Sequence, residues 1–451
     1  MTQCVRTLGI AIILTLPCTK AGAQVPQSYR KLWNDPAVAQ RIERNIEKYR
    51  KGDTTIKIVR QDGQAVGEAS VEVRQQTHAF LFGCNAFVLG QLDTPEKNRK
   101  YEEAFVRLFN FATVPLYWEG TEPTQGELRY AEGSRDMWRR PPPDRFLPFA
   151  ARHGLTLKGH PLVWHAYNPP WLPKDADALR NLYKKRIAEI AGRYANDIKI
   201  WDVVNESLCS SKSYPLYTPD RGYVAWAFRE AAARFRPDNL LMINEVTFSN
   251  CSAGEANPYY RQVKQLLAEG VGVKGIGFQF HFFSADDLQK GLASRGYLPQ
   301  NLLNVYDSFA DFNLPLFVTE ITIPTPPGNS QAAQAELVGN FYRLWFSAPQ
   351  MAGITWWNLG DGTAVKGENK ALGGLIDERF EPKDSYRTLD RLINQQWKTR
   401  LSAKTDSEGV VRFRGFYGKY AVQVSAGGKT QEFEIDLLKN GRGTHQLTLK
   451  P

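Results

Sequence analysis

One pattern repeats along the chain from residue 79 to about residue 395. A short apolar run is followed by a longer segment, such as ALRNLYKKRIAEIAGRYA or GYVAWAFREAAARF, whose apolar positions recur at helical spacing. The apolar runs are predicted to be strands, and they are Ala79–Ala86, Phe109–Pro115, Leu157–Trp164, Ile198–Glu206, Leu240–Val246, Gly275–His281, Pro315–Ile321 and Gly353–Leu359.

Strands that alternate with helices favour βαβ units and parallel pairing. Eight such units within residues 79–396 predict a (β/α)8 TIM barrel, an α/β fold. A doubly wound sheet is the alternative, but no glycine-rich phosphate loop follows the first predicted strand.

The two ends of the chain follow a different pattern. Within residues 24–78, Asp35 and Pro36 predict the start of a helix that runs to Arg50, and residues 54–75 alternate like a β-hairpin with its bend at Asp62-Gly63. Residues 397–451 alternate again, with glycine turns between the runs. We therefore expect the N-terminal hairpin and the C-terminal strands to build one small accessory β module beside the barrel.

The first 23 residues read as a secretory signal peptide. Arg6 precedes the short apolar run Leu8–Pro17, and Ala21-Gly-Ala23 fits a cleavage site before Gln24. A lipoprotein anchor at Cys18 is disfavoured by the preceding Pro17. No later apolar run approaches membrane length, so a secreted or periplasmic protein without membrane attachment is predicted.

Charge and cysteines exclude several classes of protein. The net charge of +10 falls to +8 without the signal peptide, which holds Arg6 and Lys20 but no acid, and the basic residues are too dispersed for a nucleic-acid site. Three cysteines remain, which is no disulfide framework; one Cys209–Cys251 bridge is conceivable, with Cys84 a buried thiol. We expect a monomer.

Two glutamates end predicted strands on opposite sides of the barrel. In WDVVNES, Asn205 and Glu206 end the fourth strand, and Glu320 ends the seventh in PLFVTEIT. The carboxyl ends of barrel strands carry functional side chains. Paired carboxylates suit glycoside hydrolysis, with a separation of about 5–5.5 Å for retention of anomeric configuration and about 6.5–9.5 Å for inversion.

Six motifs extend this picture, in the order GHPLVWH (159–165), WDVVNE (201–206), GIGFQFH (275–281), FVTEITIP (317–324), GITWWNLGD (353–361) and GLIDERFEPKDSY (374–386). Together they resemble glycoside hydrolase family 10, the xylanase family of retaining (β/α)8 hydrolases. The resemblance covers roughly residues 79–395.

The resemblance implies a role for each matching residue. Glu206 would be the acid/base and Glu320 the nucleophile, and Asn205 would hold the sugar 2-hydroxyl. The remaining residues would contact the nucleophile or the sugar: His281 would hydrogen-bond Glu320, Trp357 would form an apolar platform, and the attacked sugar would be lined by His160, Trp164 and Gln279. No cofactor is implied. His160 and His281 resemble a metal pair, but no third ligand has fitting spacing, so no metal site is predicted.

The second strand departs from the family pattern. Family members commonly carry a Glu, an Asn and a Lys there that grip sugars, and this chain has Thr113, Val114 and Tyr117 instead. Glu119 is a partial replacement at best. The loop after the eighth strand also lacks the family's second Trp, and the fifth strand ends in NEV where the family tends to have NDY. We expect an unusual glycone pocket.

The sequence leaves two other functions open: a glycan-binding protein on an inactive scaffold, and a β-glucoside or cellulase-like hydrolase of a related barrel family. The best-supported function is a secreted retaining hydrolase of β-1,4-xylan or a related β-linked glycan. Asp202 and Glu245 are predicted to support the barrel and Trp356 to face the helices, while His165 fits core packing and cleft equally well.

Overall fold

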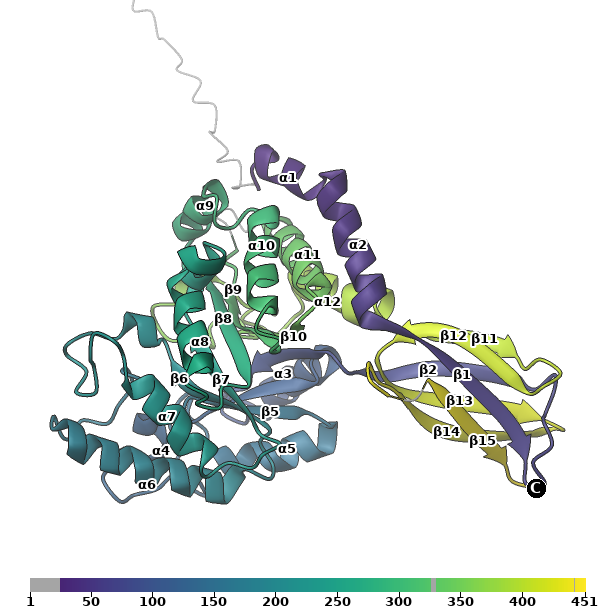
Figure 1. Ribbon diagram of the computed structural model, residues 1–451, viewed down its shortest axis with the longest axis horizontal. Coiled ribbons are helices and arrows are strands. Elements are labelled where there is room, and N and C mark those ends of the chain that lie inside the picture. Colours follow the sequence, from purple (N-terminus) through teal and green to yellow (C-terminus); the bar gives the residue numbers. More distant parts are fainter. Residues whose placement is uncertain (1–24, 326–329, 442) are drawn as a thin grey trace, which may run out of the picture.

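The computed structural model describes residues 25–325, 330–441 and 443–451, so the predicted signal peptide lies outside the described residues. Eight parallel strands close into a barrel in the order β10-β3-β4-β5-β6-β7-β8-β9 (Figure 1). Their bounds are β3 Leu81–Asn85, β4 Phe111–Pro115, β5 Thr156–His160, β6 Ile200–Asn205, β7 Leu240–Glu245, β8 Gly275–His281, β9 Leu316–Thr322 and β10 Met351–Trp356. The predicted barrel is therefore confirmed.

The strands are shorter than several of the predicted runs. β5 ends at His160, yet Leu162 and Val163 beyond it remain buried. The apolar run in the sequence therefore marks burial, which continues into the loop, and it does not mark the last residue of the strand. β6 and β9 are buried on both faces, as expected for a parallel sheet covered by helices.

Helices surround the barrel and pack on it in one continuous core (Figure 1). Several begin at side-chain caps; Thr94 and Asp175, for example, each accept a backbone N–H bond. The helices are α3 Pro95–Leu108, α4 Trp118–Thr121, α5 Phe146–His153, α6 Ala176–Tyr194, α7 Tyr223–Ala232, α8 Pro258–Ala268, α9 Ala285–Ala293, α10 Pro299–Ala310, α11 Gln331–Ser347 and α12 Asp384–Arg391.

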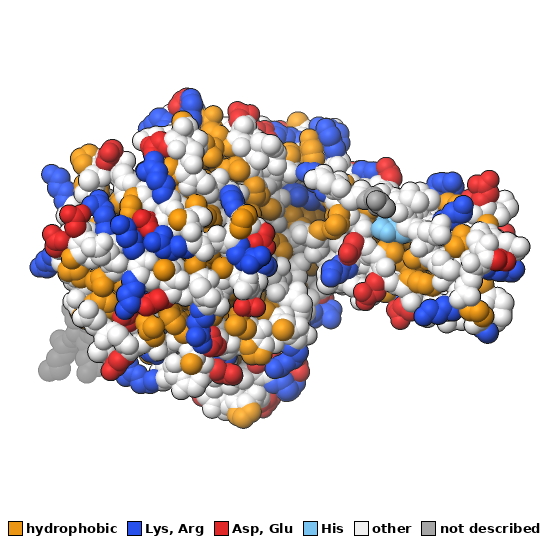
Figure 2. Space-filling model, turned by 60° about the horizontal axis from the view of Figure 1, so that its bottom comes forward, with side chains coloured by type: hydrophobic (Ala, Val, Ile, Leu, Met, Phe, Trp, Pro, Cys, Tyr) orange, Lys and Arg blue, Asp and Glu red, His pale blue; other side chains and the backbone are white. Residues whose placement is uncertain are grey.

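Strands from both chain ends form a two-sheet β-sandwich that projects from the barrel (Figures 1 and 2). One sheet has the order β12-β1-β15 and the other β11-β2-β13-β14, around a shared apolar core. The strands are β1 Lys51–Arg60, β2 Ser70–His78, β11 Arg400–Lys404, β12 Val410–Phe416, β13 Gly418–Ala426, β14 Lys429–Leu437 and β15 Thr444–Leu449. The expected accessory module is thus present.

The predicted hairpin at residues 54–75 is wrong. β1 pairs with β12 and β15, whereas β2 pairs with β11 and β13, so the two strands lie in opposite sheets. The chain does turn at Asp62-Gly63, with backbone bonds such as Arg60 N–H to the Gln64 carbonyl, but the local pairing ends at the isolated bridge between Val59 and Ala65. An alternating strand has one apolar face to bury, and its pattern does not specify the neighbour along its hydrogen-bonding edge.

The N-terminal helices α1 Gln27–Trp33 and α2 Pro36–Arg50 lie along the outside of the barrel, α2 against α11, and α2 leads directly into β1 of the sandwich (Figure 1). Asp35 accepts the amide of Ala37 at 2.8 Å, which confirms the predicted cap.

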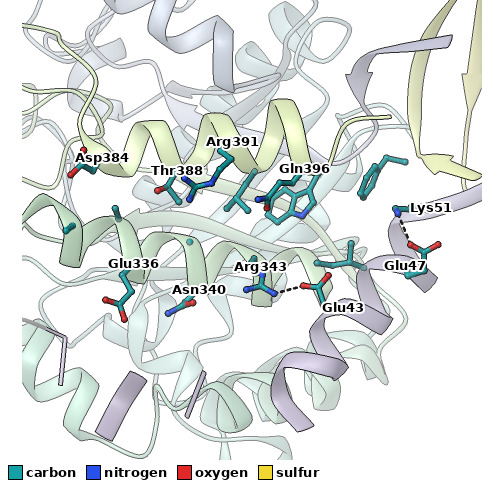
Figure 3. Close-up of a pocket in the computed structure, with 17 residues that line it drawn as sticks. Glu43, Glu47, Lys51, Glu336, Asn340, Arg343, Asp384, Thr388, Arg391 and Gln396 are labelled. Carbon is teal, nitrogen blue, oxygen red and sulfur yellow. Dashed lines mark hydrogen bonds and ion pairs between the residues drawn. The ribbon is translucent and has the colours of Figure 1, made fainter. Parts of the chain in front are cut away.

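A groove of about 790 Å³ runs between α2, α11 and α12 (Figure 3). Ion pairs occupy much of its wall: Arg343 lies 2.5 Å from Glu43, and Lys51 lies 2.7 Å from Glu47. Charged side chains therefore line this groove where the helices meet, and its lining shares no residue with the barrel mouth described below.

Cys209 and Cys251 carry free thiols, so the conceivable bridge between them is not formed, and Cys84 is buried as expected. Basic and acidic side chains are interspersed over the face shown in Figure 2. Within the described ranges, no helix has the length and apolar character needed to cross a membrane.

Candidate active site

Glu206 and Glu320 meet at the mouth of the barrel. Glu206 follows β6 directly, with a left-handed φ of 54°, and Glu320 lies in β9. Gln279, from β8, donates its Nε2 to Oε1 of Glu206 at 2.9 Å and to Oε1 of Glu320 at 3.1 Å. Because 2.9 Å and 3.1 Å are measured from one nitrogen, the two oxygens are no more than about 6.0 Å apart.

Glu320 is only 4% exposed and sits in a set of donors. Asn244 donates to its Oε1 at 2.8 Å, and Nε2 of His281 lies 3.2 Å from its Oε2. Burial raises the pKa of Glu320 to about 7, against the opposing effects of the nearby cations and the hydrogen bond from Asn244. Burial also lowers the pKa of His281 to about 4, so this imidazole is neutral at ordinary pH.

Behind Glu320 lies a buried chain of charges. Nζ of Lys158 and Nδ1 of His160 lie 2.6 Å and 2.7 Å from the same oxygen of Asp202. Burial favours the protonated form of Asp202, but Lys158 and His160 prevail and lower its pKa below the usual range. Asp202 therefore orients His160, whose Nε2 is 4.0 Å from Glu320, in keeping with its predicted supporting role.

Glu206 lies in a different environment from Glu320, and that environment favours its protonated form. Its Oε2 accepts a bond of 3.2 Å from Nε1 of Trp164. Burial raises its pKa; the bond from Gln279 opposes the rise and the charge on Glu320 adds to it. His165 packs edge-on against Trp164 and Tyr214 and does not line the cleft. Of its two predicted roles, core packing and cleft lining, the structure therefore supports core packing.

Asn205 lies beside the carboxylates with its amide partly free. Its Oδ1 accepts from Asn244 at 2.8 Å, while its buried Nδ2 has no hydrogen-bond partner among the described residues. A buried donor without a partner is uncommon and points to a group supplied by a ligand.

The cleft above the carboxylates has a volume of about 440 Å³ and an aromatic wall. Trp357 lines it and packs edge-on against His160 and Phe87. Tyr167 stacks on Trp164 with centroids 5.1 Å apart, and Phe283 stacks on His281 at 4.7 Å. Trp357, Tyr167 and Phe283 are surfaces on which sugar rings can pack, and Tyr167 and Phe283 are the more exposed of the three. Trp356, the neighbour of Trp357, is fully buried and does not line the cleft, as predicted.

The divergent second strand has a distinct structure. Thr113 and Val114 are fully buried, and Tyr117 packs against His160 and Trp164, with centroid distances of 5.4 Å and 5.7 Å. Glu119, considered above as a replacement grip, lies 3.4 Å from Arg140.

Sequence reasoning missed four polar residues of the site: Asn244, Lys158, Arg139 and Arg140. Lys158 could have been found, because a lysine inside an apolar run such as LTLKGH needs a buried partner. Glu245, next to Asn244, is fully buried on Ser207 and the Leu208 amide and does not line the cleft, in keeping with its predicted supporting role. Among the described residues, no three His, Cys, Asp or Glu side chains group as a metal site requires.

A closed parallel barrel that carries two carboxylates bridged by one amide at its mouth defines a barrel glycoside hydrolase. The family model "Glycosyl hydrolase family 10" matches residues 86–391, so the chain belongs to this family.

Two curated proteins and one solved structure illustrate what the chain is similar to. The chain is 27% identical over 325 residues to endo-1,4-beta-xylanase B of Thermotoga neapolitana, covering 67% of this chain and 85% of that protein. It is 26% identical over 412 residues to anti-sigma-I factor RsgI6 of Acetivibrio thermocellus, covering 90% of this chain but only 49% of that longer protein. Among solved structures, xylanase 10B from Thermotoga petrophila RKU-1, in complex with xylobiose, has a TM-score of 0.59 at 25% identity and covers 70% of this chain and 95% of its own.

Proposed function

We propose that the protein is an exported, monomeric retaining hydrolase that cleaves β-1,4-xylan or a related β-linked glycan by double displacement. One observation carries the stereochemical part of this proposal, namely the amide of Gln279 shared between Glu206 and Glu320. Its two bonds limit Oε1 of Glu206 and Oε1 of Glu320 to a separation of about 6.0 Å, which is below the separation of about 6.5–9.5 Å that leaves room for an inverting water.

In the first step Glu206 protonates the leaving oxygen while Glu320 attacks the anomeric carbon and forms a glycosyl ester. The environment supports this division of labour. The bond that Asn244 donates to Glu320 opposes the rise that burial gives the pKa of this carboxyl and so favours its anion, and the charge of that anion helps Glu206 to keep its proton.

In the second step the ester at Glu320 has no charge, so the pKa of Glu206 falls and its carboxylate can take a proton from the attacking water. The free Nδ2 of Asn205 would donate to the sugar 2-hydroxyl throughout. No step in this sequence requires a cofactor.

The substrate class rests on relatives named as xylanases and on a solved relative that holds xylobiose. Export rests on the predicted signal peptide of residues 1–23. Glycan binding without catalysis and β-glucoside cleavage are the competing functions. Each predicts a result of the following experiment that differs from the result expected for a xylan hydrolase.

The test is hydrolysis of aryl β-xylobioside and aryl β-cellobioside, with the first product followed by NMR. We expect the xylobioside to be preferred and the β-anomer to appear first. Glu206→Ala with added azide should yield a β-glycosyl azide, and Glu320→Ala should be inactive, whereas the exposed-site control Glu103→Gln should match the wild type. An α-anomer would refute retention; no cleavage by wild type would favour the binding protein.

A further inference from the structure

Two consecutive arginines, Arg139 and Arg140, line the same cleft as the catalytic glutamates. They belong to the irregular segment between α4 and α5, and they are only 3% and 8% exposed. Guanidinium groups are rarely this buried unless an anion accompanies them.

Arg139 is anchored on one side only. Its Nη1 donates to Oδ1 of Asn358 at 2.7 Å and to the carbonyl of Thr363, and its guanidinium lies 5.4 Å from the ring of Phe87. Its Nε is buried without a hydrogen-bond partner within the described part of the chain. Both acceptors of Nη1 are uncharged, and no described carboxylate forms an ion pair with Arg139.

Arg140 packs over an aromatic ring that lines the cleft. Its guanidinium is 3.8 Å from the ring centre of Tyr117, which in turn packs on His160 and Trp164. One side chain thus separates this cation from the residues around Glu320. Its one ion pair, to Glu119 at 3.4 Å, is longer than the usual charge-assisted bond of about 2.7–2.9 Å.

The charge of this pair is incompletely balanced by the protein. Burial lowers the pKa of Arg139, and the carboxylate of Glu368, which lines the cleft, opposes this only at a distance. The buried Nε of Arg140 likewise has no hydrogen-bond partner among the residues that the structure describes. Neutral sugar hydroxyls would leave Arg140 with only its long pair to Glu119, and Arg139 with only the more distant charge of Glu368, which is costly in a closed site.

We infer that this cleft recognises a carboxylate on the substrate, so that the preferred glycan carries a uronic acid at or next to the sugar bound on Tyr117. A planar carboxylate matches the fork of donors on a guanidinium and can accept two parallel bonds. This inference rests on the proposed glycosidase function and names the substrate class of the same site.

The first test compares two substrates that differ in one group. Glucuronoxylan is assayed beside the same polymer after its carboxylates have been reduced to alcohols, and 4-nitrophenyl β-glucuronide beside 4-nitrophenyl β-glucoside. We expect kcat/KM to favour the acidic member of at least one pair by about tenfold or more, and rising salt to erode that ratio.

Variants locate the effect. Arg140→Gln and Arg139→Gln should each lower the acid-to-neutral ratio by about 10- to 100-fold, and Arg140→Lys should retain part of it. Arg152→Gln, an exposed arginine on α5, should leave the ratio unchanged. Melting temperatures check that each variant folds. A wild-type ratio near one in both pairs, or a ratio that survives both glutamine variants, overturns the inference.

A binding measurement separates this inference from the proposed function. The Glu320→Ala variant is titrated by calorimetry with a xylo-oligosaccharide that carries one glucuronic acid, and with its carboxyl-reduced form. Tighter binding of the acidic form supports the inference even if no substrate is cleaved, and equal binding refutes it. Cleavage of neutral xylo-oligosaccharides with equal binding would refute the inference alone.

Discussion

Asn244 donates its Nδ2 to Oε1 of Glu320 across 2.8 Å, and the same nitrogen lies 2.8 Å from Oδ1 of Asn205. One amide therefore links the proposed nucleophile to the residue proposed to hold the sugar 2-hydroxyl. Its own Oδ1 accepts a 2.5 Å bond from Thr319, which fixes the orientation of the amide.

Replacing Asn244 should shift the acidic limb of the pH–activity profile to higher pH. Burial raises the pKa of Glu320, and the bond from Asn244 opposes that rise, so Asn244→Ala should raise the pKa further. We expect kcat/KM at pH 6 to fall by about tenfold or more, with partial recovery at higher pH. Asn340→Ala, in the groove of Figure 3, serves as the control. An acidic limb at the same pH as in the wild type would contradict the proposal that Asn244 lowers the pKa of Glu320.

The raised pKa of Glu320 also predicts how stability depends on pH. A carboxyl whose folded-state pKa, about 7, exceeds its unfolded value of 4.5 contributes stability below that unfolded value and loses it as pH rises through 7. Glu320→Gln removes the ionisable group, so it should raise the free energy of unfolding by about 3 kcal/mol at pH 8.5 and change it little at pH 4.5. Denaturation curves of both proteins at both pH values provide the measurement. An equal change in unfolding free energy at pH 4.5 and pH 8.5 would contradict a raised pKa for Glu320.

Asp202→Asn should destabilise the protein as well as reduce activity. Lys158 and Asp202 are both fully buried and 2.6 Å apart, so the substitution leaves a buried ammonium without its counter-charge. The expected loss is about 3–5 kcal/mol of unfolding free energy. The double variant Lys158→Met with Asp202→Asn should recover much of this loss; if it does not, the charge pairing is not the cause.

Asn205→Ala should affect only substrates that have a 2-hydroxyl. Its Nδ2 is a buried donor without a partner in the described structure, so a sugar hydroxyl is the group it can bind. We expect kcat/KM for an aryl β-xyloside to fall by about tenfold or more, and that for the matching 2-deoxy glycoside to change far less. Equal losses on both substrates would show that Asn205 acts only through its neighbours.

Ending the chain at residue 396 should make the protein aggregate. β1 would lose both of its partners, β12 and β15, and apolar side chains such as Ile56, Ile58 and Val73 would face water. Light scattering and thermal melting compare this chain with the full one. Equal solubility and equal melting temperature would contradict a shared core.

The barrel could be predicted because its strands are buried on both faces, so each leaves a continuous apolar run between helical segments. Glu206 and Glu320 could be placed for the same reason, since each closes such a run. The hairpin prediction failed because alternation shows which face of β1 is buried and is silent about which strand lies beside it.

Other parts of the site leave little trace in the sequence. Arg139 and Arg140 stand in an aperiodic loop and reach the cleft only because that loop folds over Tyr117. Asn244 lies in an apolar strand beside a glutamate, and only the finished barrel shows that the asparagine, and not Glu245, faces the proposed nucleophile.

The sandwich takes β1 and β2 from before the barrel and β11 to β15 from after it, so the barrel is topologically an insertion within the smaller unit. During synthesis, β1 and β2 leave the ribosome long before the strands with which they pair. The sandwich can therefore close only after β15 has been synthesised, and a chain interrupted before that point would display two unpaired, aggregation-prone strands that chaperones and proteases can recognise.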